Sequence, residues 1–237
     1  MPPAGQTEIE LAPVIGERVQ SVEVQSDLEL LDSEKQVSYE RAKRIFDIAA
    51  AAFGLLLLLP LFIVVAICIK LEDPKGPVLF NQTRVGRGGQ TFRMYKFRSM
   101  VKDAEKRLND LLASNEIQGA MFKMKSDPRI TRVGGFIRKT SIDELPQLVN
   151  VLTGSMSLVG PRPPLPREVE AYTDYQMRRL TVTPGCTGLW QVSGRNDLSF
   201  EQMVELDLSY IRTRTIWLDI KILFRTVKIV FIPNSAY

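Results

Sequence analysis

The chain of 237 residues contains no histidine and only two cysteines, Cys68 and Cys186. The missing histidine excludes a Ser-His-Asp triad, a phosphohistidine intermediate and any metal site with a histidine ligand. The two cysteines lie in no metal-ligand spacing and suggest no disulfide framework, which favours a reducing, cytoplasmic setting for the soluble part. Acid–base and nucleophilic chemistry must therefore fall to carboxylates, lysine, tyrosine, serine or cysteine.

Charge is distributed unevenly along the chain. Residues 1–40 hold nine acidic and two basic residues, so their net charge is −7, and the rest carries +11 because the whole chain carries +4. The first 38 residues also lack a periodic apolar stripe and the basic-then-apolar pattern of a cleaved signal peptide. We expect residues 1–40 to form a flexible acidic cytoplasmic tail, and the basic body to bind an anionic partner such as phospholipid, nucleotide or nucleic acid.

A long apolar run extends from Ile48 to Ile69, enough to cross a bilayer as a helix of about 20 residues. Pro60 lies in its middle, where a proline removes a backbone hydrogen bond and kinks a helix. Two interpretations stay open, a single-pass helix or a segment that bends at Pro60 and leaves by the face it entered. The second suits the bases at both ends, since a spanning helix usually has its basic excess on one side. These bases are Arg41, Lys43 and Arg44 before the run, and Lys70, Lys75, Arg84 and Arg87 after it.

Apolar residues at helical spacing predict a short helix from Ser141 to about Leu152, with Thr140 or Ser141 as its N-cap and Gly154 as its stop. The apolar stripe consists of Leu145, Leu148, Val149 and Leu152.

Asp143 and Glu144 would lie in the first turn of this helix, where free N–H groups and the helix dipole favour negative charge. Arg138 precedes the turn and Arg162 follows the helix, so the group suits a metal-bound phosphate. A purely structural interpretation stands beside this one, because Ser141-x-x-Glu144 has the pattern of a capping box. Adjacent helical residues point about 100° apart, so the two carboxylates should do different jobs.

A β-hairpin is predicted before this stretch, with strands at 78–80 and 92–97 and a glycine-rich turn at 86–89. Lys96 and Arg98 leave it on one face and could meet an anion, although a solvated face is the default for both. Other predictions are helices over 101–118, about 166–180, 200–212 and 217–231, a turn at 127–129 and a loop–strand–loop at 183–196 that ends near Arg195. The last helix has an apolar side and a basic side, which suits a membrane interface. Packing on the domain core explains it equally well.

Four sequence blocks together resemble the monotopic phosphoglycosyl transferases, bacterial sugar transferases that prime exopolysaccharide, capsule, O-antigen or glycoprotein glycan synthesis. The resemblance covers about residues 40–233. The blocks are Lys96-Phe97-Arg98-Ser99-Met100, Arg138-x4-Asp143-Glu144-Leu145-Pro146-Gln147-Leu148-x-Asn150-Val151, Met156-Ser157-Leu158-Val159-Gly160-Pro161-Arg162-Pro163, and Pro184-Gly185-x-Thr187-Gly188-x-Trp190-Gln191-Val192-x-Gly194-Arg195.

The resemblance implies an α+β, mostly helical fold on the cytoplasmic face of the bacterial inner membrane, with both termini cytoplasmic. After the tail at residues 1–40, residues 41–72 would form a re-entrant helix–break–helix with its break at Pro60. Residues 73–237 would form a small catalytic domain with the β-hairpin and interfacial amphipathic helices.

The resemblance also implies a reaction, the transfer of a sugar-1-phosphate from a UDP-sugar to undecaprenyl phosphate with release of UMP. Asp143 would be the nucleophile, and Glu144 would bind Mg²⁺. Arg138, Arg162, Arg195 and Lys96 would contact substrate phosphates or the nucleotide. Membrane lipid is then the anionic surface, and no nucleic acid partner is expected.

Physical chemistry is compatible with these roles, because a metal ion and arginines would neutralise a phosphodiester that otherwise repels a carboxylate. The same neighbours should lower the pKa of Asp143 and keep it ionised. Two alternatives remain, a one-step transferase with Asp143 as general base and a non-enzymatic membrane-anchored adaptor. The sequence does not distinguish galactose from glucose or an N-acetylated sugar.

Overall fold

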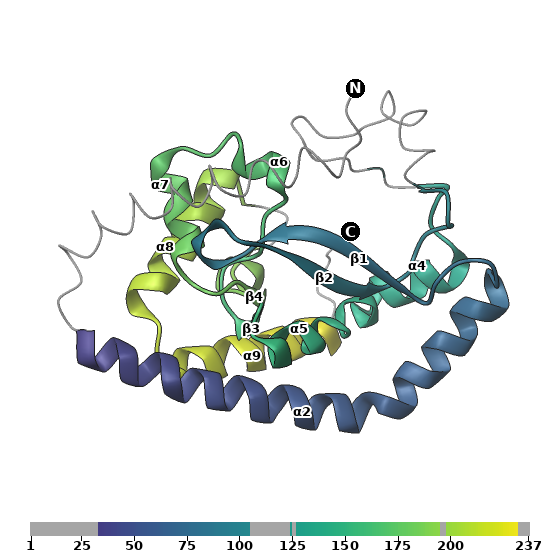
Figure 1. The fold of residues 1–237 in the computed structure, drawn as a ribbon, viewed down its shortest axis with the longest axis horizontal. Helices are drawn as coiled ribbons and strands as arrows, with labels where there is room; N and C mark the ends of the chain where they lie inside the picture. The colour runs from purple at the N-terminus through teal and green to yellow at the C-terminus, as the bar shows by residue number, and fades with distance from the viewer. Residues whose placement is uncertain (1–32, 105–123, 125–126, 195–197, 232–237) are drawn as a thin grey trace.

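The computed structural model describes residues 33–104, 124, 127–194 and 198–231 (Figure 1). In this part of the chain, helices predominate over two small two-stranded sheets, which confirms the predicted α+β, mostly helical class. The helices are α2 (Ser33–Glu72), α4 (Arg132–Lys139), α5 (Gln147–Thr153), α6 (Pro166–Val169), α7 (Asp174–Met177), α8 (Phe200–Thr213) and α9 (Ile216–Phe231). The strands are β1 (Leu79–Val85), β2 (Thr91–Phe97), β3 (Ser157–Val159) and β4 (Gly185–Thr187), and short 3₁₀ turns are η1 (Arg87–Gly89), η3 (Ile142–Glu144), η4 (Arg178–Thr181) and η5 (Trp190–Val192).

Helix α2 is the longest element and lies along one edge of the molecule (Figure 1). It starts at Ser33, inside the predicted tail, and runs for 40 residues without interruption through Pro60. Figure 1 shows that the helix bends along its length, as a proline inside a helix requires. At about 1.5 Å per residue it is roughly 60 Å long, about twice the thickness of a bilayer's hydrocarbon core.

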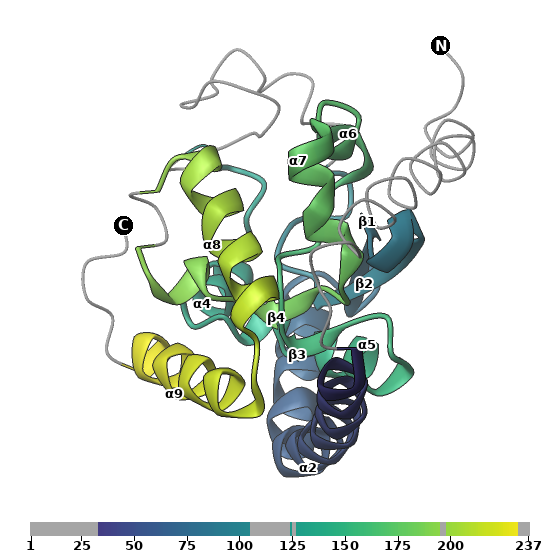
Figure 2. The same ribbon diagram turned by 90° about the vertical axis from the view of Figure 1, so that its left-hand side faces the viewer.

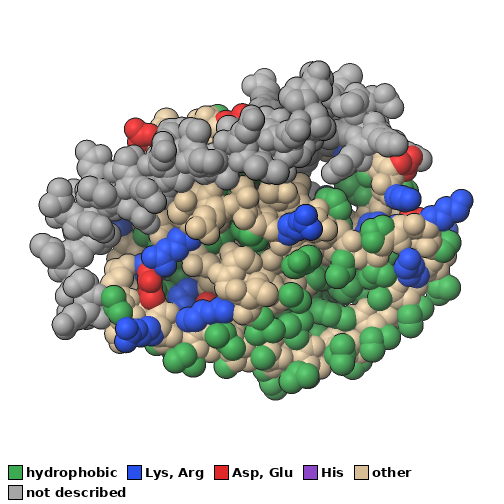
Figure 3. Space-filling model, in the orientation of Figure 1, with side chains coloured by type: hydrophobic (Ala, Val, Ile, Leu, Met, Phe, Trp, Pro, Cys, Tyr) green, Lys and Arg blue, Asp and Glu red, His purple; other side chains and the backbone are tan. Residues whose placement is uncertain are grey.

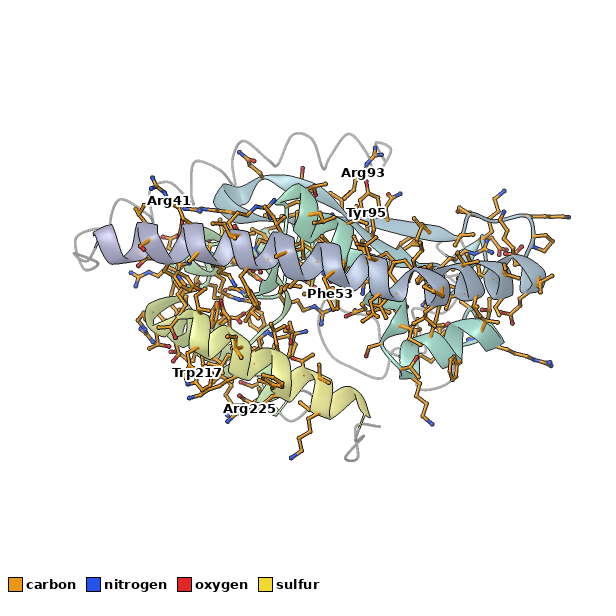
Figure 4. All side chains as sticks on the ribbon, turned by 90° about the horizontal axis from the view of Figure 1, so that it is seen from below. Arg41, Phe53, Arg93, Tyr95, Trp217 and Arg225 are labelled. Carbon is orange, nitrogen blue, oxygen red and sulfur yellow. The ribbon has the colours of Figure 1, made fainter. Side chains whose placement is uncertain are left out.

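One face of the molecule is apolar. Residues 36–72 of α2 are long and apolar enough to cross a membrane, and only 11% of the most apolar window is buried. Figure 3 shows hydrophobic side chains gathered along the edge formed by α2. Seen from below, α9 lies beside α2, with Phe53 on α2 and Trp217 on α9 (Figure 4). The exposed apolar residues include Phe53, Leu56, Leu57, Leu59, Ile63, Val64, Ile67 and Leu71 on α2, and Trp217, Phe224 and Val227 on α9.

Polar side chains hold the first part of α2 against the rest of the molecule. The Lys43 ammonium donates to Asp219 of α9 at 2.7 Å, and the Asp47 carboxylate accepts from the Leu158 N–H at 3.1 Å. The Arg44 guanidinium donates to the last carbonyls of α5, those of Val151 at 2.6 Å and Leu152 at 2.8 Å. A cation at a helix C-terminus satisfies carbonyls that have no partner within the helix.

The last part of α2 contacts the same body. The Glu72 carboxylate accepts from the Arg132 and Val133 N–H groups at 2.7 and 3.0 Å, which caps the start of α4. Val65 and Ile69 pack in a buried cluster with Phe97 and Ile137. Both ends of α2 therefore rest on the globular part of the molecule, which stands above the helix in Figure 2.

The predicted hairpin is confirmed, since β1 and β2 pair antiparallel with Val85 opposite Thr91. The first strand is longer than the predicted 78–80 and extends to Val85. Gly88 in the turn between them has φ 65°, a conformation that glycine adopts without strain. Strand β3 pairs in parallel with β4, and a Cβ on Gly185 would lie only 2.1 Å from the backbone nitrogen of Gly160. Glycine is needed there because the two backbones touch.

The structure confirms some of the other predicted elements and contradicts others. The predicted helices over 200–212 and 217–231 are confirmed as α8 and α9, and the turn at 127–129 is present, with the Ile130 N–H bonded to the Asp127 carbonyl at 3.1 Å. The single helix predicted over 166–180 is wrong. The structure has α6, α7 and η4 there, because Thr173 and Gln176 form a capping box that starts a new helix. Among the described residues 183–194 the strand is only β4, and Trp190–Val192 is a 3₁₀ turn. Most of the helix predicted at 101–118 lies outside the described residues.

Candidate active site

The carboxylates Asp143 and Glu144 lie on the short turn η3 between α4 and α5, and not in the first turn of a helix over 141–152 as predicted. Pro146 precedes α5 and cannot donate the backbone hydrogen bond that would continue a helix through it. Ser141 has φ 56° and makes no side-chain cap, so the predicted capping box is absent. Gly154 ends α5 with φ 89°, as expected.

Packing on both sides fixes the conformation of η3. Ile142 contacts the buried cluster that contains Phe97 and Ile137. On the other side, Asn150 ties α5 to β2, because its carboxamide accepts from the Tyr95 N–H at 2.9 Å and donates to the Arg93 carbonyl at 2.7 Å. A left-handed serine costs free energy, so the surrounding contacts must hold it in place.

Asp143 is buried, with 8% of its surface exposed. Burial raises the pKa of its carboxyl to about 6, and the neighbouring Glu144 adds to this, whereas Lys96 and Arg138 oppose it. The expected lowering of the Asp143 pKa is therefore wrong for the protein alone, since desolvation outweighs the nearby cations.

Glu144 is bonded to Lys96, whose Nζ lies 2.6 Å from Oε1. Burial by itself would raise the pKa of Glu144. Lys96, Arg162 and Arg84 outweigh that effect and lower the pKa below its ordinary value. The two adjacent carboxylates thus differ in their titration, with Glu144 the more readily ionised. Lys96 thus lies beside Glu144, and its contact with a substrate phosphate stays a prediction, whereas Arg98 turns to Asp73 at 3.1 Å.

The structure describes two of the three arginines that were predicted to bind phosphate, Arg138 and Arg162. Arg138 at the end of α4 and Arg162 after β3 are exposed, and neither donates a side-chain hydrogen bond to another described residue. Both are close enough to η3 to act on its carboxyl groups, Arg138 on Asp143 and Arg162 on Glu144. Arg195 lies outside the described residues.

The sequence argument missed two residues that shape the site, Arg84 and Asn150. Arg84 is buried on β1, and burial together with Arg162 lowers its pKa to about 10, while Glu168 and Glu144 oppose that change. A signal for Asn150 was available, since it interrupts the apolar run from Leu148 to Leu152. A buried amide inside such a run needs hydrogen-bond partners, which indicates a bond from this helix to a neighbouring element.

The donor set fits Mg²⁺ and suits no histidine- or thiolate-bound metal. Within the described ranges, no group of three or more acidic, cysteine or histidine side chains could hold a metal ion. Mg²⁺ needs only one or two protein carboxylates, because substrate phosphates and water complete its shell. The Glu144 side chain is 43% exposed and ionised, so it can supply such a ligand.

Comparison with known proteins shows that the chain matches the model of one protein family. The model described as "Bacterial sugar transferase" matches residues 38–233. The galactosyl transferase CpsE of Streptococcus agalactiae serotype III is 50% identical over 226 residues, which are 94% of this chain and 49% of that protein. The undecaprenyl-phosphate galactose phosphotransferase of Salmonella typhimurium is 49% identical over 82% of this chain and 41% of its own length.

A shorter relative matches along most of its length. The exopolysaccharide production protein ExoY of Rhizobium meliloti is 40% identical over 83% of this chain and 88% of its own. The chain thus spans less than half the length of the first two relatives and nearly all of the third.

Proposed function

Because the chain belongs to the bacterial sugar transferase family, we propose that it transfers a hexose-1-phosphate from a UDP-sugar to undecaprenyl phosphate and releases UMP. This would be the priming step of a cell-surface glycan such as an exopolysaccharide, capsule or O-antigen. The names of two relatives refer to galactose, which makes UDP-galactose the first donor to test. The observation that carries the proposal is the pair of unlike carboxyl groups on η3, one buried and one ionised beside Lys96.

The proposed mechanism has two displacements at one phosphorus atom. A carboxylate oxygen of Asp143 attacks the phosphorus next to the sugar, and the bond to the bridging oxygen breaks, so that UMP leaves with that oxygen. The phosphosugar is then bound to Asp143 as an acyl phosphate. A phosphate oxygen of undecaprenyl phosphate attacks the same phosphorus and displaces the Asp143 carboxylate. Neither displacement needs a general base, which agrees with a chain that has no histidine.

The surrounding residues would neutralise the negative charge of the substrate phosphates. Arg138 and Arg162 are exposed next to η3 and are free to bind phosphate oxygens, which a guanidinium can do with two parallel bonds. Lys96 orients Glu144, the proposed Mg²⁺ ligand. Bound Mg²⁺ would supply positive charge that reduces repulsion between the diphosphate and Asp143.

We also propose that α2 enters and leaves the membrane by its cytoplasmic face. A helix that spans the membrane has its two ends on opposite sides of the bilayer. Here Lys43 and Arg44 near one end, and Glu72 at the other, bind groups of the same globular body. The bend and the exposed apolar side chains between these ends suit a helix that dips into the lipid. The acceptor's phosphate, which lies at headgroup level, would then be within reach of the site.

The direct test is chemical trapping. Purified protein incubated with Mg²⁺ and radiolabelled UDP-galactose, without acceptor, should release UMP and gain label on Asp143. Adding undecaprenyl phosphate should discharge that label into lipid. Asp143→Asn should acquire none, and UDP-glucose and UDP-N-acetylated sugars tested in parallel should identify the donor.

Two other outcomes have definite meanings. UMP that forms only when both substrates are present, with no labelled protein after rapid quench, would make Asp143 a general base in a one-step transfer. No UMP from any donor would leave the membrane-anchored adaptor as the better description.

A further inference from the structure

The segment around Arg162 has few hydrogen-bond donors of its own. Residues 161, 163, 164 and 166 are prolines, which have no backbone N–H. The carbonyls of this segment can accept hydrogen bonds, but the prolines cannot return them, so the donors must come from other elements. Gly185 on β4 supplies one, since its N–H donates to the Pro161 carbonyl at 2.8 Å.

Two neighbouring residues of β1 supply the donors on the other side of Arg162. Nη1 of Arg84 donates to the Pro163 carbonyl at 3.0 Å. The Val85 N–H donates to the Pro164 carbonyl, also at 3.0 Å. The Arg84 side chain is itself held, because Nη2 donates to Oε1 of Gln82 at 2.7 Å. Arg84 thus fixes the residue that directly follows Arg162.

A buried guanidinium is more than this structural task requires. Removing a charge from water costs free energy, and a neutral amide could also donate to a carbonyl. Arg84 is only 6% exposed, and within the described part of the chain its Nε has no hydrogen-bond partner. Its charge is close enough to Arg162 and Glu144 for both to shift its pKa. The charge therefore lies near Arg162 and Glu144, on the side of the site that is proposed to bind phosphate.

We propose that Arg84 is a positioning residue that holds Arg162 opposite Glu144 by fixing the Pro163 carbonyl from the β1–β2 hairpin. This inference rests on the proposed function, because Arg162 is taken to bind a substrate phosphate. The hairpin joins the two halves of the site, since β1 carries Arg84 and its partner β2 carries Lys96, the residue bonded to Glu144.

A double-mutant cycle tests this inference. Arg84→Met and Arg162→Ala are made singly and together, and each protein is measured for KM in UMP release and for Kd toward UDP by calorimetry. Each single change should weaken UDP binding about tenfold, and the double variant should bind no more weakly than the worse single variant. The reason is that the position of the Arg162 side chain no longer matters once it has been removed. Arg84→Lys keeps one donor for Pro163 and should recover part of the loss.

Arg179→Met is the matched control. Arg179 is an equally buried arginine, bonded to Asp207 on α8, outside the proposed site. Its loss should lower the Tm, leave the Kd for UDP unchanged and add to the effect of Arg162→Ala. Strict additivity between Arg84→Met and Arg162→Ala would overturn the inference.

The two readouts separate the possible failures. A wild-type protein that binds UDP but releases no UMP would overturn the proposed function, while the UDP cycle would still decide the role of Arg84. A wild-type protein that binds no UDP would overturn both. If Arg84→Met fails to fold, the same cycle built with Arg84→Lys gives the decision.

Discussion

At the scale of single residues, the site separates two adjacent carboxyl groups by their surroundings. Asp143 is buried and its pKa is raised to about 6, whereas Glu144 is bonded to Lys96 and its pKa is lowered. A nucleophile that is poorly solvated reacts more readily once ionised, but the folded protein must tolerate its charge. The free energy of unfolding should therefore be lower when Asp143 is ionised in the folded protein.

We predict that Asp143→Asn stabilises the metal-free protein at pH 7.5 by roughly 2–3 kcal/mol while abolishing transfer. The carboxyl titrates near pH 4 in an unfolded chain and near pH 6 in the fold, so the folded state holds an extra proton between these values. Its contribution to the free energy of unfolding is thus fully present below about pH 4 and is lost as the pH rises through 6. Unfolding at pH 7.5 and at pH 4 checks this, and an equal difference at both values would contradict it.

Glu144→Gln makes the complementary prediction. Removal of the neighbouring negative charge should lower the pKa of Asp143 in metal-free protein, because Glu144 is one of the groups that raise it. NMR titration of carbon-13-labelled aspartate would report the change. Lys96→Met should move the same pKa upward, since Lys96 lowers it. An unchanged Asp143 titration in both variants would show that the charges are screened from each other.

At the scale of elements, α4 determines where Arg138 lies. Its N-cap Thr131 accepts from the Gly134 N–H at 2.9 Å, and the Thr131 N–H donates to the Ser99 carbonyl at 3.2 Å. A Cβ on Gly134 would lie 1.9 Å from that same Ser99 oxygen. Backbone packs directly on backbone there, so no flexible side chain can move aside.

The adjacent glycines of α4 provide a matched pair. Gly134→Ala should destabilise the protein by about 1–3 kcal/mol and impair transfer, because α4 must move away from the segment after β2. Gly135→Ala should be neutral or stabilise by up to about 1 kcal/mol, because its nearest contact is Ile130 at 3.9 Å and alanine favours helix. Thermal unfolding of the two variants measures the difference. Equal effects would mean that the close approach to Ser99 is not maintained.

Much at this scale could be predicted from the sequence, and the failures have physical causes. Periodicity identified α8 and α9, and alternation identified β2, because each pattern reflects burial of one face. The helix predicted over 141–152 was wrong at its start. Ser141-x-x-Glu144 has the residue pattern of a capping box, but α5 begins only after Pro146. Arg84 was missed because the predicted first strand ended at residue 80, and because charged residues are rarely buried. Its proline-rich partner segment lies 79 residues away in sequence.

At the scale of the whole molecule, α2 is the element that would connect the membrane to the proposed site. We predict that Arg41→Cys and Lys75→Cys, each made in a variant without Cys68 and Cys186, are both protected from a membrane-impermeant maleimide in intact cells. Both should react after permeabilisation, because both ends of α2 rest on one globular body. Labelling of only one of the two from outside would establish a true span and remove the re-entrant proposal.

The bond between Lys43 and Asp219 joins residues 176 positions apart, so it also imposes an order in time. During translation α2 is made before α9, so Lys43 lacks this partner until Asp219 has been synthesised. Tyr210 also lacks its bond to Asp219 until that residue has been made, because its hydroxyl donates to the carboxylate at 2.7 Å. A chain stalled before residue 219 would therefore carry α2 without its bond to α9. The packing of α2 against the globular body would be complete only after α9 has been made.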